Sequence, residues 1–448
     1  MGILHQEPLP LPDLRVTLED TFLVFPSQET ERKSIFLSNI DQVLNFDVQT
    51  VHFFPPHPDF PPSVVARKLQ NALSEVLVPY SFLAGRLSLN KELGRLEIDC
   101  NSAGAGFVVA SCQHSLDEIG DLVYPNPAFR QLIVQRLDKL GQHDQPLCIF
   151  QVTAFRCGGF AMGISTNHST FDGLSFKMFL ENLAAQAADK PLPIPPFNDR
   201  HLLAARSPPR VTFPHPELLK LKLPVGQDQA PPAFDCQEDD LDFQIFRLSS
   251  GEISSMKEKA KAGSSATGVK VTGFNVVTAH LWRCKALSCD TGNLDRESTV
   301  LYAVDIRQRL VPALPRSYTG NAVLTAYATA ACRELEAGPL GRLVEMVAGG
   351  AARMTDEYAR SAIDWGEMHK GFPRGEFLIS SWWRLGFGAV EYPWGKPRYS
   401  CPVVYHRKDI ILLFPDMDDD GVNVLVALPA KEMELFKTFF HKFLLLEN

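Results

Sequence analysis

A histidine and an aspartate stand four residues apart in the segment 165–173, which reads STNHSTFDG and contains His168, Asp172 and Gly173. The apolar residues before it predict a strand, and the pattern from 175 to 187 predicts a helix. An imidazole at such a junction has a fixed backbone and can face a cavity, and its usual pKa of roughly 6.5 suits a general base. Spacing alone also fits a plain turn histidine, because the chain has 12 histidines.

Composition limits the class of protein. A length of 448 residues favours two domains of roughly 200 residues each. Hydrophobic residues make up 45% and charged residues 21%, which is typical of a globular protein. The net charge of −8 argues against a nucleic-acid partner, since such a partner requires a basic face.

The cysteines and the N-terminus indicate the compartment. The nine cysteines are odd in number and scattered, and none forms a Cys-x-x-Cys pair. This pattern predicts reduced thiols in the cytoplasm, with neither a zinc site nor a disulfide framework. The first residues do not resemble a signal peptide, and no apolar run reaches the length of a membrane span.

The elements that must position His168 can be read from periodicity. The N-terminal half predicts strands at 14–25, 43–54 and 96–99, a helix capped by Ser63 that ends near Pro79, and a hairpin of strands 148–155 and 160–166. The second strand of this hairpin delivers His168.

The C-terminal half also alternates strands and helices. It predicts a strand at 242–248, a helix opened by the capping box of Ser249 and Glu252, a helix capped by Thr272, a strand at 300–307, a helix around 334–360, and a hairpin of strands 410–414 and 422–428 before a final helix with Pro429 as its first residue. Between the halves, the proline-rich segment 189–235 predicts a crossover. The expected domains are therefore 1–188 and 236–448.

The turn of the last hairpin holds Asp416, Asp418, Asp420 and Gly421, as at the start of an EF-hand calcium loop. The bidentate glutamate of such a loop would fall at Ala427, and no flanking helices are expected. A solvated acidic turn is the preferred interpretation, and no metal is expected.

Five separated motifs resemble those of the plant BAHD acyltransferases, and they occur in the family's order. His168–Gly173 resembles the family's His-x-x-x-Asp-Gly signature, and Leu83–Leu87 resembles its Ala-Gly-Arg segment. The remaining three are Thr278–Cys284, Asp305–Arg307 followed by Gly320–Ala322, and Tyr392–Pro397.

The resemblance implies an α/β fold with mixed sheets, in the form of two chloramphenicol-acetyltransferase-like domains with a channel at their interface. It implies acyl transfer from acyl-CoA, as a co-substrate, to an alcohol or amine. No metal, permanently bound cofactor or covalent acyl-enzyme is implied. We expect a cytoplasmic monomer without a membrane span.

One motif departs from the family pattern. The family's Asp-Phe-Gly-Trp-Gly reads Glu391-Tyr392-Pro393-Trp394-Gly395 here. Pro393 fixes φ near −65°, so this position cannot adopt a positive φ. We expect a change in loop geometry without loss of activity.

The chemistry assigns roles to these residues. His168 is the expected base, and Trp394 and backbone amides near Gly173 are candidate donors to a tetrahedral intermediate. The resemblance implies that Asp172 is structural and pairs with Arg307, with Asn321 close by, and that Gly173 and Gly395 are structural too.

Contacts with CoA or substrate are expected from four further residues, namely Ser169, Thr170, Ser254 and Lys257. The helix N-terminus near Ser254 is a candidate phosphate site. A solvated helix face is the preferred interpretation for Lys257.

Several functions remain open. The segment 380–385 resembles members that use hydroxycinnamoyl donors, which slightly favours an aromatic acyl group over acetyl. A condensation-type peptide-bond enzyme is disfavoured, because Asn167 stands where that class carries a second histidine. A non-catalytic binding protein on the same fold is disfavoured by the intact His168.

Overall fold

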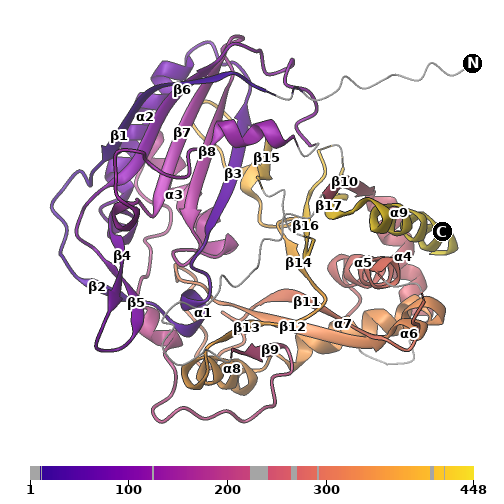
Figure 1. The fold of residues 1–448 in the computed structure, drawn as a ribbon. Coiled ribbons are helices and arrows are strands. Elements are labelled where there is room, and N and C mark those ends of the chain that lie inside the picture. The colour runs from indigo at the N-terminus through magenta and orange to yellow at the C-terminus, as the bar shows by residue number, and fades with distance from the viewer. Residues whose placement is uncertain are drawn as a thin grey trace, which may run out of the picture. The chain divides into compact units, whose positions relative to one another are not determined.

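The computed structural model describes residue 11 and residues 13–123, 126–221, 241–263, 270–289, 292–403, 408–417 and 419–447. The chain divides into two compact units. The first unit comprises Met1–Leu202, Pro315–Asn321 and Leu385–Val404, and the second comprises Leu203–Leu314, Ala322–Arg384 and Tyr405–Asn448. Each unit contains a six-stranded mixed sheet with helices packed against it, as Figure 1 shows. The expected α/β class is therefore confirmed.

The sheet of the first unit has the order β1-β6-β7-β8-β3-β15. Its strands are β1 (Val16–Val24), β6 (Ala105–Cys112), β7 (Cys148–Phe155), β8 (Phe160–Asn167), β3 (Asp47–Phe54) and β15 (Tyr399–Pro402). Only β6 and β7 pair in parallel, and the other neighbours are antiparallel. A smaller sheet in this unit has the order β2-β5-β4, with β2 (Ser34–Phe36), β5 (Arg95–Asp99) and β4 (Arg86–Asn90).

The predicted hairpin that leads to His168 is confirmed by the β7–β8 pair. Its turn contains Gly158 at φ +86°, a conformation that favours glycine. All eight residues of β8 are buried, and the five residues 168–172 separate the strand from α3 (Gly173–Ala187). A rigid strand and a helix therefore hold the His168 turn from both sides.

Helix α2 (Pro62–Val76) packs against α3 and against β7. It buries the apolar residues expected from the period of 3.6, including Val65, Leu69 and Leu73. The prediction of Ser63 as the N-cap is wrong, because the N-cap is Pro61 and the helix begins at Pro62. Pro62 occupies the first helical position, where a missing N–H group breaks no helical hydrogen bond.

The sheet of the second unit has the order β10-β17-β16-β14-β11-β12. Its strands are β10 (Leu241–Leu248), β17 (Val422–Pro429), β16 (Ile410–Pro415), β14 (Phe377–Ser381), β11 (Glu297–Asp305) and β12 (Val323–Ala331). Here β14 pairs in parallel with both β11 and β16. A short ladder joins β9 (Leu218–Lys220) to β13 (Gly371–Pro373).

Helices cover this sheet. They are α4 (Ser250–Ala262), α5 (Gly273–Cys289), α6 (Cys332–Ala337), α7 (Leu340–Arg353) and α9 (Ala430–Glu447), while α8 (Asp356–Met368) follows α7 in the chain. The predicted capping box of Ser249 and Glu252 is present at α4. In Figure 1, α5 lies between α7 and α9, and it contacts both.

Two predictions for the second unit are wrong. The helix expected around 334–360 is three helices, because Gly338-Pro339 ends the first and Thr355 caps the third. Pro429 is the last residue of β17, paired with Leu241, and α9 starts after it.

The units differ from the expected domains at two places. Residues Leu385–Val404 belong to the first unit, because β15 adds to the edge of its sheet beside β3. The motif at 391–395 was therefore wrongly assigned to the C-terminal domain. Of the expected crossover, 189–202 belongs to the first unit and 203–221 to the second, while 222–235 lies outside the described residues.

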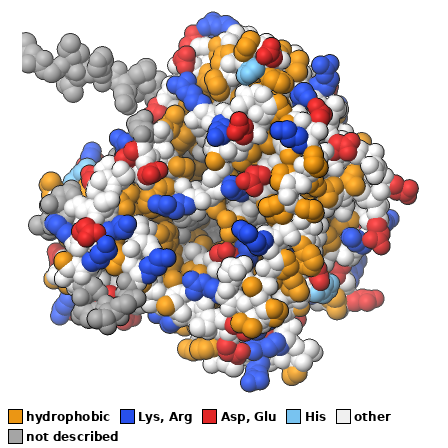
Figure 2. Space-filling model, turned by 180° about the vertical axis from the view of Figure 1, so that it is seen from behind, with side chains coloured by type: hydrophobic (Ala, Val, Ile, Leu, Met, Phe, Trp, Pro, Cys, Tyr) orange, Lys and Arg blue, Asp and Glu red, His pale blue; other side chains and the backbone are white. Residues whose placement is uncertain are grey.

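The surface and the cysteines bear on the class of protein. On the face drawn in Figure 2, basic and acidic side chains are interspersed over most of the surface. Within the described ranges, no helix has the length and apolar character required to span a bilayer. The eight cysteines that the structure describes are free thiols.

Two adjacent glycines in α7 give a test of how this helix packs. A Cβ atom at Gly350 would lie 2.0 Å from the Tyr302 hydroxyl and 2.4 Å from the Tyr327 carbonyl oxygen, whereas one at Gly349 meets nothing within 4 Å. We expect Gly350→Ala to lower the free energy of unfolding by at least about 2 kcal/mol through overpacking. We expect Gly349→Ala, the matched control, to raise it by about 0.5–1 kcal/mol. Urea unfolding of both variants measures the difference, and equal effects would contradict this packing.

Candidate active site

The His168 turn follows directly after β8. The backbone N–H of His168 donates to the carbonyl oxygen of Phe46 at 2.8 Å, which ties the turn to the residue before β3. The imidazole meets the Phe46 ring edge-on at 5.2 Å between centroids. Its Nδ1 is buried and has no hydrogen-bond partner among the described residues, while the residue as a whole is only half-buried. Nε2 is therefore the candidate nitrogen for contact with a substrate.

Burial lowers the pKa of His168 below its usual value. The negative charges of Asp172 and Asp41 oppose this effect. A lowered pKa keeps the ring neutral at pH 7, and only the neutral ring accepts a proton. The electrostatics therefore suit a general base.

Asp172 is the N-cap of α3. Its carboxylate accepts from the backbone N–H of Ser175 at 3.0 Å, and the side chain is buried. This contact fixes the junction between the His168 turn and the helix. The structural role expected for Asp172 fits this geometry, although its charge also acts on His168.

Gly173 is the first residue of α3, and a Cβ there would lie 2.5 Å from Cδ1 of Leu385. The glycine thus allows the segment that begins at Leu385 to approach the start of the helix. This contact supports the structural role expected for Gly173.

Ser169 and Thr170 were expected to contact substrate, and the structure places their hydroxyls elsewhere. Ser169 Oγ donates to Asn167 Oδ1 at 2.6 Å, and Thr170 Oγ1 donates to the Asn167 carbonyl oxygen at 2.5 Å. Both side chains are fully buried. Both hydroxyls therefore hold the turn together, and the expected contact of Ser169 and Thr170 with substrate has no support in these bonds.

Asn321 lies at the His168 turn. Its Nδ2 donates to the His168 carbonyl oxygen at 2.8 Å and to Asp41 Oδ1 at 2.8 Å. The sequence did not point to Asp41, because this residue lies 127 positions before His168 and belongs to none of the five motifs.

Arg307 follows the end of β11 in the second unit. Its Nη1 donates to Asp305 Oδ1 at 3.0 Å, and its side chain is largely buried. A plain surface cation is therefore excluded. The pairing of Arg307 with Asp172, which belongs to the other unit, stays a prediction.

Trp394 was a candidate donor to the reaction intermediate, and the structure contradicts this. Its ring stacks on Tyr392 at 5.2 Å and meets Phe160 edge-on at 6.0 Å. Phe160 begins β8, whereas His168 follows the end of that strand. Seven strand steps of about 3.3 Å separate the two ends by roughly 20 Å. Trp394 is a packing residue at the far end of the sheet.

Gly395 has φ +98° and closes a tight turn, in which the backbones of Tyr392 and Gly395 exchange hydrogen bonds of 2.9 and 3.2 Å. The positive φ falls on this glycine, and Pro393 is not among the residues with positive φ. The structural role expected for Gly395 fits its turn.

Ser254 and Lys257 lie on α4 of the second unit, with Ser254 exposed and Lys257 half-exposed. The donors at the start of this helix are already occupied. Ser249 Oγ accepts from Glu252 N–H, and Asp419 accepts from Ser250 N–H at 3.1 Å. The carboxylates of Glu252 and Asp419 also make this helix end unfavourable for a phosphate. The expected contact with CoA therefore has no support here.

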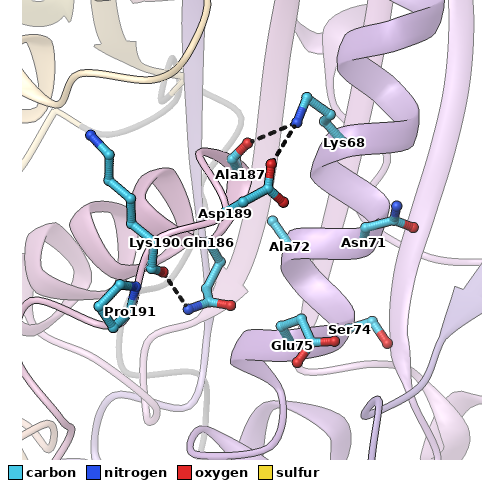
Figure 3. Close-up of a pocket in the computed structure, with 10 residues that line it drawn as sticks. All are labelled: Lys68, Asn71, Ala72, Ser74, Glu75, Gln186, Ala187, Asp189, Lys190 and Pro191. Carbon is cyan, nitrogen blue, oxygen red and sulfur yellow. Dashed lines mark hydrogen bonds and ion pairs between the residues drawn. The ribbon is translucent and has the colours of Figure 1, made fainter.

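A cleft of about 560 Å³ lies between α2 and the C-terminal end of α3 (Figure 3). Lys68 spans it and donates to the Ala187 carbonyl oxygen at 3.3 Å and to Asp189 at 3.2 Å. The 15 residues of α3 separate this end from the His168 turn by about 20 Å. The cleft is therefore not part of the candidate site.

Other acidic and histidine groups in the structure serve packing. In the last hairpin turn, Asp416 accepts from Arg247, and Asp419 accepts from Ser250. His280 is fully buried in α5, and burial lowers its pKa to about 3. Among the residues that the structure describes, no three His, Cys, Asp or Glu side chains form a group that could hold a metal ion.

Comparisons with known proteins agree with this geometry. The model of the Transferase family matches residues 14–442. The chain is similar to "Acyltransferase GLAUCE" of Arabidopsis thaliana, with 62% identity over 98% of this chain and 99% of that protein. It is also similar to the "Fatty alcohol:caffeoyl-CoA acyltransferase" of Arabidopsis thaliana, with 32% identity over 95% of this chain and 98% of that protein.

Among solved structures, vinorine synthase matches with a TM-score of 0.73 at 23% identity, over 94% of this chain and 96% of that chain. This likeness shows that the two proteins share a fold. Together, the full-length family match, the plant relatives and the His-x-x-x-Asp-Gly turn show that the chain belongs to the Transferase family of BAHD acyltransferases and is an acyltransferase.

Proposed function

We propose that this acyltransferase moves an acyl group from an acyl-CoA thioester to the hydroxyl or amine of an acceptor, with His168 as general base. The observation that carries the proposal is a half-buried imidazole on a rigid turn, whose Nδ1 is buried and whose pKa is lowered by burial. An alcohol attacks a thioester poorly unless its proton leaves during the attack. His168 Nε2 takes that proton as the new bond forms.

The reaction then needs no acyl-enzyme. The acceptor oxygen or nitrogen attacks the thioester carbonyl directly, the tetrahedral intermediate collapses, and CoA leaves as a thiolate or takes the proton held by His168. Binding both substrates beside one base makes the step effectively unimolecular, which lowers its barrier. The candidate donors to the intermediate are the backbone amides near Gly173, since Trp394 lies at the far end of the sheet.

An aromatic, hydroxycinnamoyl-type acyl group is our preferred donor, and a specialised metabolite or a long-chain alcohol is our preferred acceptor. The relative at 32% identity carries both caffeoyl-CoA and fatty alcohol in its name. Acetyl-CoA is the alternative donor. We also propose that the protein works in the cytoplasm, as a monomer and with acyl-CoA as its only co-substrate.

Turnover identifies the substrates and the base together. Mixed acyl-CoAs are incubated with pooled alcohols and amines, and products are read by mass detection while released thiol is counted. We expect ester or amide formation with an aromatic donor, and a loss of at least about 100-fold in kcat for His168→Ala, because a general base supplies rate factors of this size. Trp394→Phe, the control, keeps the ring packing, and we expect it to retain most of the wild-type kcat.

Three outcomes would contradict these assignments. Equal rates for wild type and His168→Ala would exclude His168 as the base. A loss in Trp394→Phe as large as that in His168→Ala, with the protein folded, would return Trp394 to the chemistry. A protein that turns over no donor, yet binds acyl-CoA, would favour the binding-protein alternative.

The pH profile tests the electrostatics. Because the neutral ring is the active form, kcat/KM falls as the pH drops through the pKa of His168. Burial lowers this pKa, so we expect the acid limb of the profile to lie below the usual value of roughly 6.5. Asp172 raises the pKa, so Asp172→Asn moves the limb to still lower pH. A limb above 6.5 in the wild type would refute this account.

The cap role of Asp172 is tested by comparing two substitutions. Asparagine caps helices as well as aspartate does, whereas alanine offers no acceptor. We expect Asp172→Ala to be less stable than Asp172→Asn by about 1 kcal/mol in urea unfolding. If Asp172→Asn kept its stability but lost all turnover, Asp172 would be a catalytic residue instead.

A further inference from the structure

Three consecutive backbone carbonyls of the His168 turn accept hydrogen bonds from buried side chains. The His168 carbonyl accepts from Asn321 at 2.8 Å. The Ser169 carbonyl accepts from Arg200 Nη1 at 2.6 Å, and the Thr170 carbonyl accepts from Arg200 Nη2 at 2.8 Å. The row begins at the residue that carries the proposed base.

Both donors are held by one carboxylate. Asp41 Oδ1 accepts from Asn321 Nδ2 at 2.8 Å and from the Asn321 backbone N–H at 3.2 Å. The same oxygen lies 3.3 Å from Arg200 Nη1. Neither side chain of the Asp41–Arg200 ion pair is exposed to solvent.

Asp41 is fixed in turn by a short helix, α1 (Asn39–Gln42). Its Oδ2 accepts from the backbone N–H of Ser38 at 2.9 Å and from Ser38 Oγ at 2.8 Å, which completes the capping box of this helix. Both carboxylate oxygens are therefore satisfied. A buried charge pair with all these partners is rigid, because any displacement breaks several bonds away from water.

The chemistry of arginine is required at position 200. Its planar guanidinium presents two parallel N–H groups, which match two successive carbonyls, and the Phe82 ring lies 5.3 Å from its centre. A lysine keeps the charge for Asp41 but has a single ammonium group that cannot reproduce this fork.

We propose that the Asp41–Arg200 pair positions His168 for catalysis, by fixing the carbonyls of the turn and with them the direction of the imidazole. The proposal rests on the proposed function, in which His168 is the base. Arg200 and Asp41 are positioning residues, since their contacts are with the turn and not with its imidazole. Misplacement of a base by a fraction of its hydrogen-bond length costs rate while substrate binding persists.

The test compares two buried arginines of the same unit. Arg86 donates to the backbone carbonyls of Gly85, Ala103, Gly104 and Asp144, and none of these belongs to the His168 turn. Arg200→Lys and Arg86→Lys therefore make the same chemical change, and both are expected to lower stability. Rates are normalised to the folded fraction, which circular dichroism measures at the assay temperature.

We expect Arg200→Lys to lower kcat per folded molecule by about 10- to 100-fold, with KM for donor and acceptor changed less than about threefold. Arg86→Lys keeps kcat per folded molecule within about twofold of wild type. If Arg200→Lys does not fold, Ser38→Ala decides, because it removes the two hydrogen bonds that Ser38 Oγ makes with Asp41 and leaves the ion pair. We expect a fall in kcat for Ser38→Ala without a change in KM.

A kcat for Arg200→Lys that matches that of Arg86→Lys, or a loss confined to KM, would overturn the proposal. If Arg200→Lys does not fold, an unchanged kcat in Ser38→Ala would overturn it too. His168→Ala separates this failure from that of the proposed function. A silent Arg200→Lys beside an inactive His168→Ala refutes only the positioning role, whereas an active His168→Ala refutes the base itself.

Discussion

The site depends on hydrogen-bond donors for the buried backbone carbonyls of the His168 turn. The β3–β8 ladder ends with the pair of Asp47 and Asn167, so the carbonyls that follow have no strand to accept from. A buried carbonyl without a partner costs free energy comparable to a lost hydrogen bond. Arg200 and Asn321 supply these bonds from side chains. The backbone of the turn is thereby fixed, while the imidazole keeps its exposed edge for chemistry.

Charge and geometry are linked through the same carboxylates. Burial alone lowers the pKa of His168, and a base with too low a pKa accepts protons poorly. Asp172 and Asp41 oppose the shift, yet each also has a mechanical task. Asp172 caps α3, and Asp41 completes the capping box of α1 while holding Arg200. Loss of either side chain is therefore expected to alter both the position and the basicity of the ring.

The sequence could predict those features that arise within a few residues. The β7–β8 hairpin, the Ser249–Glu252 capping box and the helix after His168 follow from periodicity and cap chemistry, and each is present. The end of α7 at Met354 was missed, because its break comes from the cap at Thr355 and not from a proline within the helix.

Long-range partners could not be predicted in this way. Asp41 and Asn321 are 280 positions apart, and only the folded sheet brings them together. Patterns within a single sequence carry no information about contacts between such distant residues. The wrong prediction for Trp394 has the same origin. Its motif shows which residues are present but not which end of β8 they contact.

The place of the altered motif in the sheet fits the expectation that it leaves activity intact. The turn from Tyr392 to Gly395 packs its rings on Phe54 and Phe160, at the end of the sheet opposite His168. Its task is to lead the chain into β15, whose partner is β3. Tyrosine in place of phenylalanine keeps the stack with Trp394, and Pro393 needs no positive φ because Gly395 supplies it. The substitution changes how a strand is attached, and the base lies roughly 20 Å further along the same sheet.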